Sequence, residues 1–272
     1  MGKIRKRNLF SLTIATLKML FFCTMILLQL PVIYLLPRGR ISVRYMKFFM
    51  RIFMLATGIR FSVHGKLSKS RPLLVVSNHI SLFEMAPLSA AFGCGFFGKK
   101  EAEKYPVIGW VSKRFNVIFL DRRPIYAFSA LRDVRNQMGR ASYPMFLFPE
   151  GTTTNGSYVK KFKSSLFDFI DGSNVTVQPI VISYKYRDGT PIDDDTLAEH
   201  FAYFNNVDQD MGPKCSRERS AFAQIFHLMM LGGFKLEVTV LPVPPREGLN
   251  RKQIAEVLQK NISDKYMELK DK

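Results

Sequence analysis

Apolar side chains dominate the first sixty residues, in runs of helical length. Residues 19–36 contain 15 apolar residues in 18, and only Thr24, Gln29 and Pro31 interrupt the run. At about 1.5 Å per residue this run measures about 27 Å, so it barely crosses a hydrocarbon core of about 30 Å. Pro31 is expected to kink the helix, because it lacks an amide proton. The sequence PRGR follows the run, where a secretory signal would have small residues, so we expect no cleavage.

A second helix is predicted over residues 41–57, and it is apolar except along one line. The basic residues that form this line fall within a narrow arc at 3.6 residues per turn. They are Arg40, Arg44, Lys47 and Arg51. Such a line suits the headgroup region of an anionic bilayer, and a core helix with a solvated face is the alternative. Since basic residues flank the apolar run on both sides, we expect a helical hairpin that dips into one leaflet rather than a single span.

From residue 60 onward the pattern changes to that of a globular domain. Short apolar or β-branched runs predict strands over residues 73–77, 117–120, 145–148, 175–184 and 235–241. Helices are predicted over residues 82–91, 107–115, 125–139 and 164–170. Residues 187–233 are expected to form an irregular insertion with a helix. Asn250 and Gln253 resemble the capping pair of a terminal amphipathic helix.

This alternation predicts an α/β fold with a mostly parallel central sheet flanked by helices, preceded by a membrane-embedded helical hairpin. We therefore divide the chain into membrane-associating helices over residues 1–60 and an α/β domain over residues 61–272.

The charge distribution separates the same two regions. The 272 residues contain 40 Lys and Arg against 22 Asp and Glu, a net charge of +18. No acid precedes Glu84, and residues 1–83 alone hold 14 basic residues. The excess therefore points to an anionic membrane as partner and not to nucleic acid, for which the globular part has no recognisable motif. Three cysteines without paired spacing, Cys23, Cys94 and Cys215, predict reduced thiols in a cytosol-facing protein.

Candidate chemistry lies where predicted strands end. His79 ends a strand in LLVVSNHISLFE, and Glu84 follows five positions later. A carboxylate in the first turn of the next helix can reach back to the imidazole. A histidine held in this way is a general base in the correct tautomer.

Two more clusters follow strands. FPEGTTTNG at residues 148–156 offers hydroxyls and backbone N–H groups for an anion or an oxyanion. VIFLDRR places Arg122 and Arg123 where guanidinium groups suit bidentate phosphate binding. The alternatives are an ordinary polar loop and a surface ion pair with Asp121.

SNHISLFE, VIFLDRR, FPEGTTTNG and VQPIVIS, in this order, resemble the four sequence blocks of the glycerophospholipid acyltransferases of the lysophosphatidic acid type. The resemblance extends roughly from residue 73 to residue 185. It implies that His79 is the catalytic base, that Arg122 binds the acceptor phosphate, and that Glu150 and Gly151 line the acceptor site. The fourth block, around Pro179, is associated with the acyl donor.

Further substrate contacts are placed near these blocks. Thr152 and the donors near Gly151 are expected to stabilise the oxyanion. Lys163 is expected to assist Arg122, with Arg123, Lys160 and Lys161 as further candidates for the same phosphate. All four of these lysine and arginine residues are basic and lie in or shortly after the second or third block.

The chain departs from the family at the partner carboxylate, because Glu84 stands where the family has Asp. The extra methylene lengthens the reach, and a small misplacement can reduce the rate severely. We expect the local backbone to compensate, and a catalytically impaired lipid-binding homologue is the alternative.

The implied reaction transfers an acyl chain from an acyl thioester, acyl-CoA or acyl-carrier protein, to the hydroxyl of a lysophospholipid. The first candidate acceptor is 1-acyl-sn-glycerol 3-phosphate, which gives phosphatidic acid. Lysophosphatidylethanolamine, lysophosphatidylcholine and a lyso-aminolipid stay open, since a Thr follows Gly-Thr where phosphatidate-forming members often carry Arg. The resemblance implies no cofactor and no metal, and a location at the cytoplasmic face of a membrane, the plasma or inner membrane if bacterial.

Overall fold

The computed structural model describes residues 8–104, 106–120, 127–202, 221–231 and 234–271. The α-helices are α1 (Leu9–Leu35), α2 (Arg40–Thr57), α3 (Met85–Phe92), α4 (Pro106–Arg114), α5 (Ala127–Gly139), α6 (Asp194–Thr196), α7 (Ala221–Leu231) and α8 (Arg251–Lys270). The strands are β1 (Arg60–His64), β2 (Leu73–Ser77), β3 (Gly95–Lys99), β4 (Val117–Leu120), β5 (Met145–Leu147), β6 (Thr176–Tyr186) and β7 (Phe234–Val240). Short 3₁₀ helices cover Leu82–Glu84, Lys100–Lys104 and Ser164–Ile170, and a π-helix covers Leu197–Phe201.

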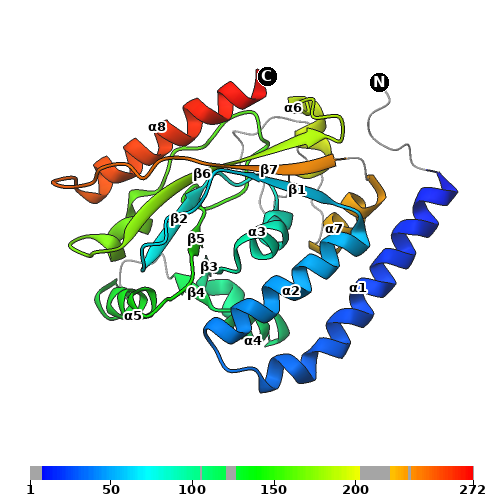
Figure 1. Cartoon of the computed structure of the whole chain (residues 1–272), viewed down its shortest axis with the longest axis horizontal. Coiled ribbons are helices and arrows are strands. Elements are labelled where there is room, and N and C mark those ends of the chain that lie inside the picture. The colour runs from blue at the N-terminus through cyan, green and yellow to red at the C-terminus, as the bar shows by residue number, and fades with distance from the viewer. Residues whose placement is uncertain (1–7, 105, 121–126, 203–220, 232–233, 272) are drawn as a thin grey trace.

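The described strands form one sheet in the order β1-β7-β6-β2-β5-β3-β4 (Figure 1). The strands from β6 to β4 in this order are parallel. β7 lies antiparallel to β6, and β1 pairs parallel with β7. The mostly parallel central sheet is thereby confirmed. Because β2 and β5 are parallel neighbours, the residues that follow them lie at the same edge of the sheet.

Two strands, β1 and β3, are missing from the sequence prediction. β3 has the sequence GFFGK, and glycine is a poor strand former. Gly95 is nevertheless required by packing, since a Cβ there would lie 2.5 Å from Met145 Sδ and 2.6 Å from the Asn116 carbonyl oxygen. β1 is an edge strand whose residues are at most partly buried, so its hydrophobic signal is weak.

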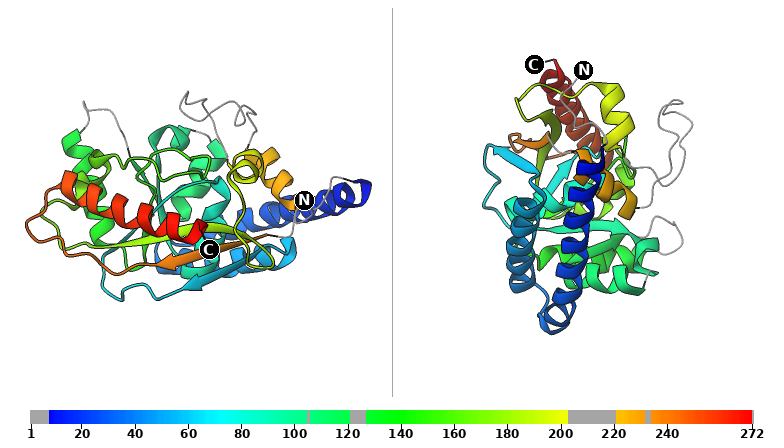
Figure 2. Two further views of the ribbon diagram at one scale, coloured as in Figure 1. Left: turned by 90° about the horizontal axis from the view of Figure 1, so that it is seen from above. Right: turned by 90° about the vertical axis from the view of Figure 1, so that its right-hand side faces the viewer.

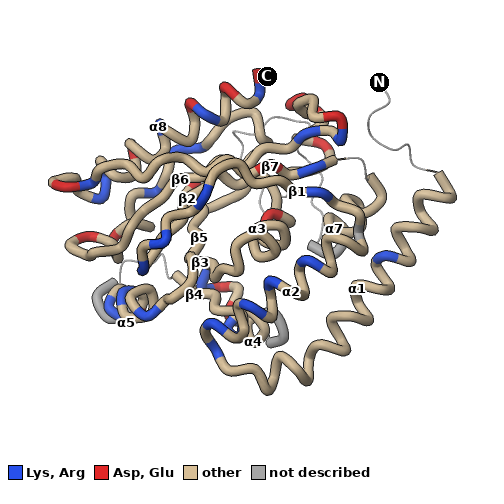
Figure 3. Tube along the Cα trace, in the orientation of Figure 1, with Lys and Arg blue, Asp and Glu red and all other residues tan. Residues whose placement is uncertain are grey.

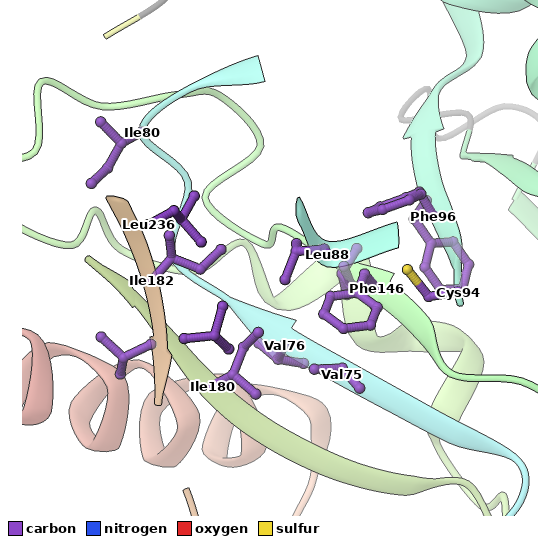
Figure 4. Packing of buried hydrophobic residues seen from close by; sticks show 14 of the residues in the cluster. Val75, Val76, Ile80, Leu88, Cys94, Phe96, Phe146, Ile180, Ile182 and Leu236 are labelled. Atoms are coloured by element: carbon purple, nitrogen blue, oxygen red, sulfur yellow. The ribbon is translucent and has the colours of Figure 1, made fainter. Parts of the chain in front are cut away.

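Side chains on both faces of the central part of the sheet are buried. All five residues of β2 are buried. Figure 4 shows Val75 and Val76 of β2 among residues of β5, β6 and β7, including Phe146, Ile180 and Leu236. α8 packs along β6.

α1 and α2 form a helical hairpin on the side of the molecule away from α8 (Figures 1 and 2). α1 begins at the capping box of Asn8, well before the apolar run predicted to be helical, and continues through Pro31. It packs against α7, α2 and α4, and it buries Ser11, Ala15 and Met19. Among the described residues it is the one helix long and apolar enough to cross a membrane.

Large apolar side chains remain exposed on this hairpin. On α2 they lie seven residues apart, at Ile41, Phe48 and Leu55. On α1 they are Leu9, Phe10, Leu12, Leu17, Leu20, Phe21, Ile26, Leu27, Leu28, Val32, Tyr34 and Leu35. The charged side chains of the described part of the hairpin are all basic (Figure 3). The hairpin therefore combines an exposed apolar surface with positive charge, as an interfacial helix pair does.

The basic line on α2 also serves the internal packing. α2 packs on α3, and Arg51 Nε donates to the Ala90 carbonyl oxygen at 3.0 Å, near the carboxyl end of α3. A cation at this end of a helix is favourable. Arg40 and Arg44 stay exposed.

Candidate active site

The predicted histidine and the loop after β5 lie side by side. β2 pairs with β5 in parallel register, with Val76 opposite Leu147. Thr154 N donates to the His79 carbonyl oxygen at 2.8 Å, and His79 N donates to Glu150 Oε1 at 2.7 Å. Residues about seventy positions apart in the chain therefore form one site.

His79 and Glu84 are in direct contact. The distance from His79 Nδ1 to Glu84 Oε2 is 2.7 Å. The Glu84 side chain is fully buried, and that of His79 is 14 % exposed. The Phe148 ring stacks on the imidazole at a centroid distance of 4.1 Å, which fixes the plane of the ring. Within the described residues, His79 Nε2 has no hydrogen-bond partner, so this nitrogen is available to a substrate.

The local backbone explains how a glutamate serves in this position. Ser81 begins the 3₁₀ helix Leu82–Glu84 and forms a capping box with Glu84. Glu84 Oε1 accepts from Ile80 N and Ser81 N, both at 3.0 Å, which leaves Oε2 for the imidazole. Glu at the third helical position is the residue that a capping box uses. The structure thus has the Glu84 carboxylate in direct hydrogen-bond contact with the imidazole.

Glu150 is placed differently from the expectation that it lines the acceptor site. Its side chain is fully buried, and its two oxygens accept from His79 N at 2.7 Å and Lys160 N at 2.8 Å. Burial raises the pKa of Glu150 to about 8, against the opposing effect of these two hydrogen bonds. Glu150 thus ties two backbone segments together and presents no open face to a ligand.

Gly151 is buried, and Thr152 and Lys163 lie beside it with more exposed side chains. Gly151 has a φ of 74°, and its N–H donates to the Phe148 carbonyl oxygen at 3.1 Å. The Lys163 side chain crosses this glycine so closely that a Cβ there would lie 3.0 Å from Nζ. Lys163 is exposed and Thr152 partly exposed. Hydroxyl, ammonium and backbone groups here suit an anion.

Arg122, predicted to bind phosphate, and its neighbour Arg123 lie outside the described residues. The cysteine Cys215 does so too. Among the residues that the structure does describe, no three His, Cys, Asp or Glu side chains are grouped to hold a metal ion.

A mostly apolar pocket, not foreseen from the sequence, lies between the hairpin and the sheet. Its volume is about 230 Å³. The lining side chains come from α1, α2, the 3₁₀ helix Leu82–Glu84, α3, α4, β3, β4, α7 and the segments next to them, and include Phe22, Met50, Phe53, Phe83, Met85 and Phe96. Phe83 and Met85, the sequence neighbours of Glu84, both line this pocket. Shape and lining fit an alkyl chain.

Two other residues of the site were missed. Asn78 joins the end of β2 to β6: its Nδ2 donates to the Ile182 carbonyl oxygen at 2.9 Å, and its Oδ1 accepts from Ile182 N at 2.8 Å. The Tyr184 hydroxyl donates to Glu84 Oε1 at 3.4 Å. Asn78 stands next to His79 in SNHISLFE, but nothing in the sequence indicates that its amide spans the two strands.

Comparison with known proteins gives the following relatives. A family model described as Acyltransferase matches residues 59–183. The lyso-ornithine lipid O-acyltransferase of Pseudomonas aeruginosa is 33% identical over 136 residues, which cover 48% of this chain and 52% of that protein. The human 1-acyl-sn-glycerol-3-phosphate acyltransferase beta is 29% identical over 140 residues, 50% of each chain. The chain thus spans about half the length of the curated relatives that it matches.

One solved structure is similar over nearly the whole chain. It is the 1-acyl-sn-glycerophosphate acyltransferase PlsC from Thermotoga maritima, with a TM-score of 0.62 and 19% sequence identity. The similarity covers 98% of this chain and 97% of that one. At this identity the likeness concerns the fold.

Proposed function

The chain belongs to the glycerophospholipid acyltransferase family through its residues 59–183, and on that premise we propose that it transfers an acyl chain from an acyl thioester to the hydroxyl of a lyso-lipid. The observation that carries the proposal is the contact of 2.7 Å between His79 Nδ1 and Glu84 Oε2. The sequence neighbours of Glu84, Phe83 and Met85, line an apolar pocket. A catalytically impaired homologue finds no support in this geometry.

The proposed mechanism follows from the two nitrogens of His79. With Nδ1–H donating to Glu84, the lone pair of Nε2 removes the proton of the acceptor hydroxyl as its oxygen attacks the thioester carbonyl. The tetrahedral intermediate collapses by breaking the C–S bond. The thiolate then takes the proton from the imidazolium, which restores the base. Glu84 fixes the tautomer and stabilises the imidazolium while it exists.

The substrates are assigned to two sides of this pair. The acyl chain occupies the apolar pocket, and an anionic group of the acceptor lies near Lys163 and Thr152. Acyl-CoA and acyl-carrier protein are both candidate donors. The first candidate acceptor is 1-acyl-sn-glycerol 3-phosphate. A lyso-ornithine lipid is the second, favoured by relatives of that name at 30% to 34% identity.

We place the enzyme on a membrane surface, at its cytoplasmic face. The exposed apolar side chains of α1 and α2 and the basic residues beside them support this location. α1 packs on α7 and α4 of the globular part, so a hairpin lying in one leaflet fits the structure better than a span. The reduced thiols expected from the sequence fit the cytoplasmic side.

The proposed function is tested by assaying membranes that contain the full chain with labelled acyl-CoA or acyl-carrier protein and a panel of lyso-lipids. We expect turnover of at least one lyso-lipid and a loss of about 10²–10⁴-fold in His79→Ala, the usual contribution of a general base. The matched control is His64→Ala, since His64 is exposed at the end of β1. Absence of turnover for the whole panel, or full activity of His79→Ala, would refute the proposal.

A further inference from the structure

Glu84 has more partners than the catalytic pair alone requires. Besides His79 and the two N–H groups of Ile80 and Ser81, its Oε1 faces the hydroxyl of Tyr184 at 3.4 Å. This tyrosine lies on β6, a hundred residues further along the chain, and the reaction described above does not use it. A glutamate has one rotatable bond more than an aspartate, so its carboxylate needs more fixed contacts to keep one orientation.

The Tyr184 ring is held in place by its surroundings. It is 3 % exposed and packs on Phe201 and Phe234, at centroid distances of 4.9 and 6.3 Å. The phenol oxygen interacts with the side chains of both Ser81 and Glu84. A buried phenol usually finds a polar partner, and here that partner is the carboxylate.

The protonation state of the phenol suits a donor. Burial, and next the charge of Glu84, raise the pKa of Tyr184 well above its ordinary value. The hydroxyl therefore keeps its proton throughout the range in which an imidazole titrates.

We propose that Tyr184 is a positioning residue of this enzyme: its hydroxyl, held by Phe201 and Phe234, keeps the Glu84 carboxylate aimed at His79 Nδ1. The inference rests on the proposed function for its effect on rate, and on geometry alone for its effect on the imidazole. Tyr184 touches neither the imidazole nor the pocket that we assign to the acyl chain.

Removing the hydroxyl has two consequences. Without the hydroxyl, the Glu84 carboxylate is freer to turn away from His79 Nδ1. The imidazole is then less well oriented, which lowers kcat without changing the KM of either substrate. The carboxylate also holds the Nδ1–H proton of His79 less tightly, so the NMR resonance of this hydrogen-bonded proton moves upfield. The other ionisable groups around this pair are Glu150 after β5, whose partner is Lys160, and Tyr266 on α8. They are unchanged in the variant.

The test compares Tyr184→Phe with wild type and with the control Tyr143→Phe, a partly buried tyrosine that precedes β5 at the other end of the strand. NMR of the four histidines, assigned with His79→Ala, detects the Nδ1–H proton of His79 in the full chain in detergent. We expect Tyr184→Phe to move this resonance upfield and to lower kcat about tenfold at unchanged KM, and Tyr143→Phe to do neither. An unmoved Nδ1–H resonance of His79 overturns the inference, whether or not a lyso-lipid is turned over.

A second comparison separates positioning from a general loss of stability. Glu84→Asp shortens the side chain and withdraws Oε1 from the phenol, so adding Tyr184→Phe to it should change kcat less than twofold. An equal tenfold loss in both backgrounds would show that Tyr184 acts through the fold, and would overturn the inference. If wild type turns over none of the lyso-lipids, the proposed function fails, and the NMR result alone decides on Tyr184.

Discussion

The Glu84 side chain binds both the local backbone and the catalytic histidine that we propose. Its Oε1 completes the capping box of Ser81, and its Oε2 holds the imidazole of His79. The two oxygens of one glutamate therefore join the backbone after β2 to the imidazole of His79.

Glu150 is the second carboxylate of the site, and its burial predicts a pH-dependent stability. Its pKa is about 8 in the folded state, against an ordinary value of 4.5. The folded chain then holds more protons than the unfolded chain between these values, so stability is highest below pH 4.5 and is lost as the pH rises through about 8. The cause is the cost of ionising a buried carboxylate.

The measurement compares wild type with Glu150→Gln by chemical denaturation in detergent between pH 5 and pH 9. We expect the unfolding free energy of wild type, relative to the variant, to fall by at least about 1 kcal/mol over this range, the equivalent of one pKa unit. The control is Glu256→Gln, at an exposed carboxylate on α8. A difference that stays constant with pH would contradict the prediction.

At the scale of elements, the site depends on a side chain that extends the pairing of β2 with β6 past the last residue of β2. β2 ends at Ser77, and the Asn78 amide then continues the pairing through both polar groups of Ile182. Both residues are buried, so neither hydrogen bond competes with water. This fixes the backbone immediately before His79.

Asn78→Ala should lower the unfolding free energy by about 2 kcal/mol, since it leaves two buried backbone groups of Ile182 without partners. Equilibrium unfolding in detergent measures the effect. The control is Asn261→Ala, at an exposed position of α8, where we expect a change within about 0.5 kcal/mol. Equal stability of the two variants would show that the Asn78 amide is not an important link.

At the scale of the whole molecule, the hairpin of α1 and α2 contributes both to the exposed surface and to the apolar pocket. The sequence alone does not show which of its residues belong to which. One side of the hairpin carries exposed apolar and basic residues, and another side supplies Phe22, Met50 and Phe53 to the apolar pocket. The same two helices thus provide both the surface that is proposed to meet the bilayer and part of the wall of the proposed acyl site.

Replacing Ile41, Phe48 and Leu55 on α2 by Ser should weaken binding to anionic phospholipid vesicles at least about tenfold. Each buried apolar side chain of this size contributes on the order of 1.5 kcal/mol, part of which is retained because α1 is unchanged. Vesicle sedimentation of the full chain measures the partition coefficient. The control replaces Val243 and Met267, two exposed apolar residues outside the hairpin, and should bind like wild type. Equal binding of both variants would show that α2 does not contact the membrane.

The sequence by itself determined the parts of this protein that depend on near neighbours in the chain. Short apolar and β-branched runs located β2, β4, β5, β6 and β7 to within about two residues, because strands inside a mostly parallel sheet are buried along nearly their whole length. The spacing of Ser81 and Glu84, which is that of a capping box, places the Glu84 carboxylate next to His79. The parallel order of strands then placed FPEGTTTNG beside the same histidine.

Only the tertiary structure decided what depends on segments far apart. β3 is a strand despite two glycines in its sequence, and Gly95 leaves room for Met145, fifty residues further along the chain. The inward turn of Glu150, the hydroxyl of Tyr184 at Glu84, and the pocket under the hairpin all arise where distant elements pack together. Periodicity and capping are local, whereas burial and the shape of a cavity are set by whichever elements meet, and a single sequence does not contain that list of contacts.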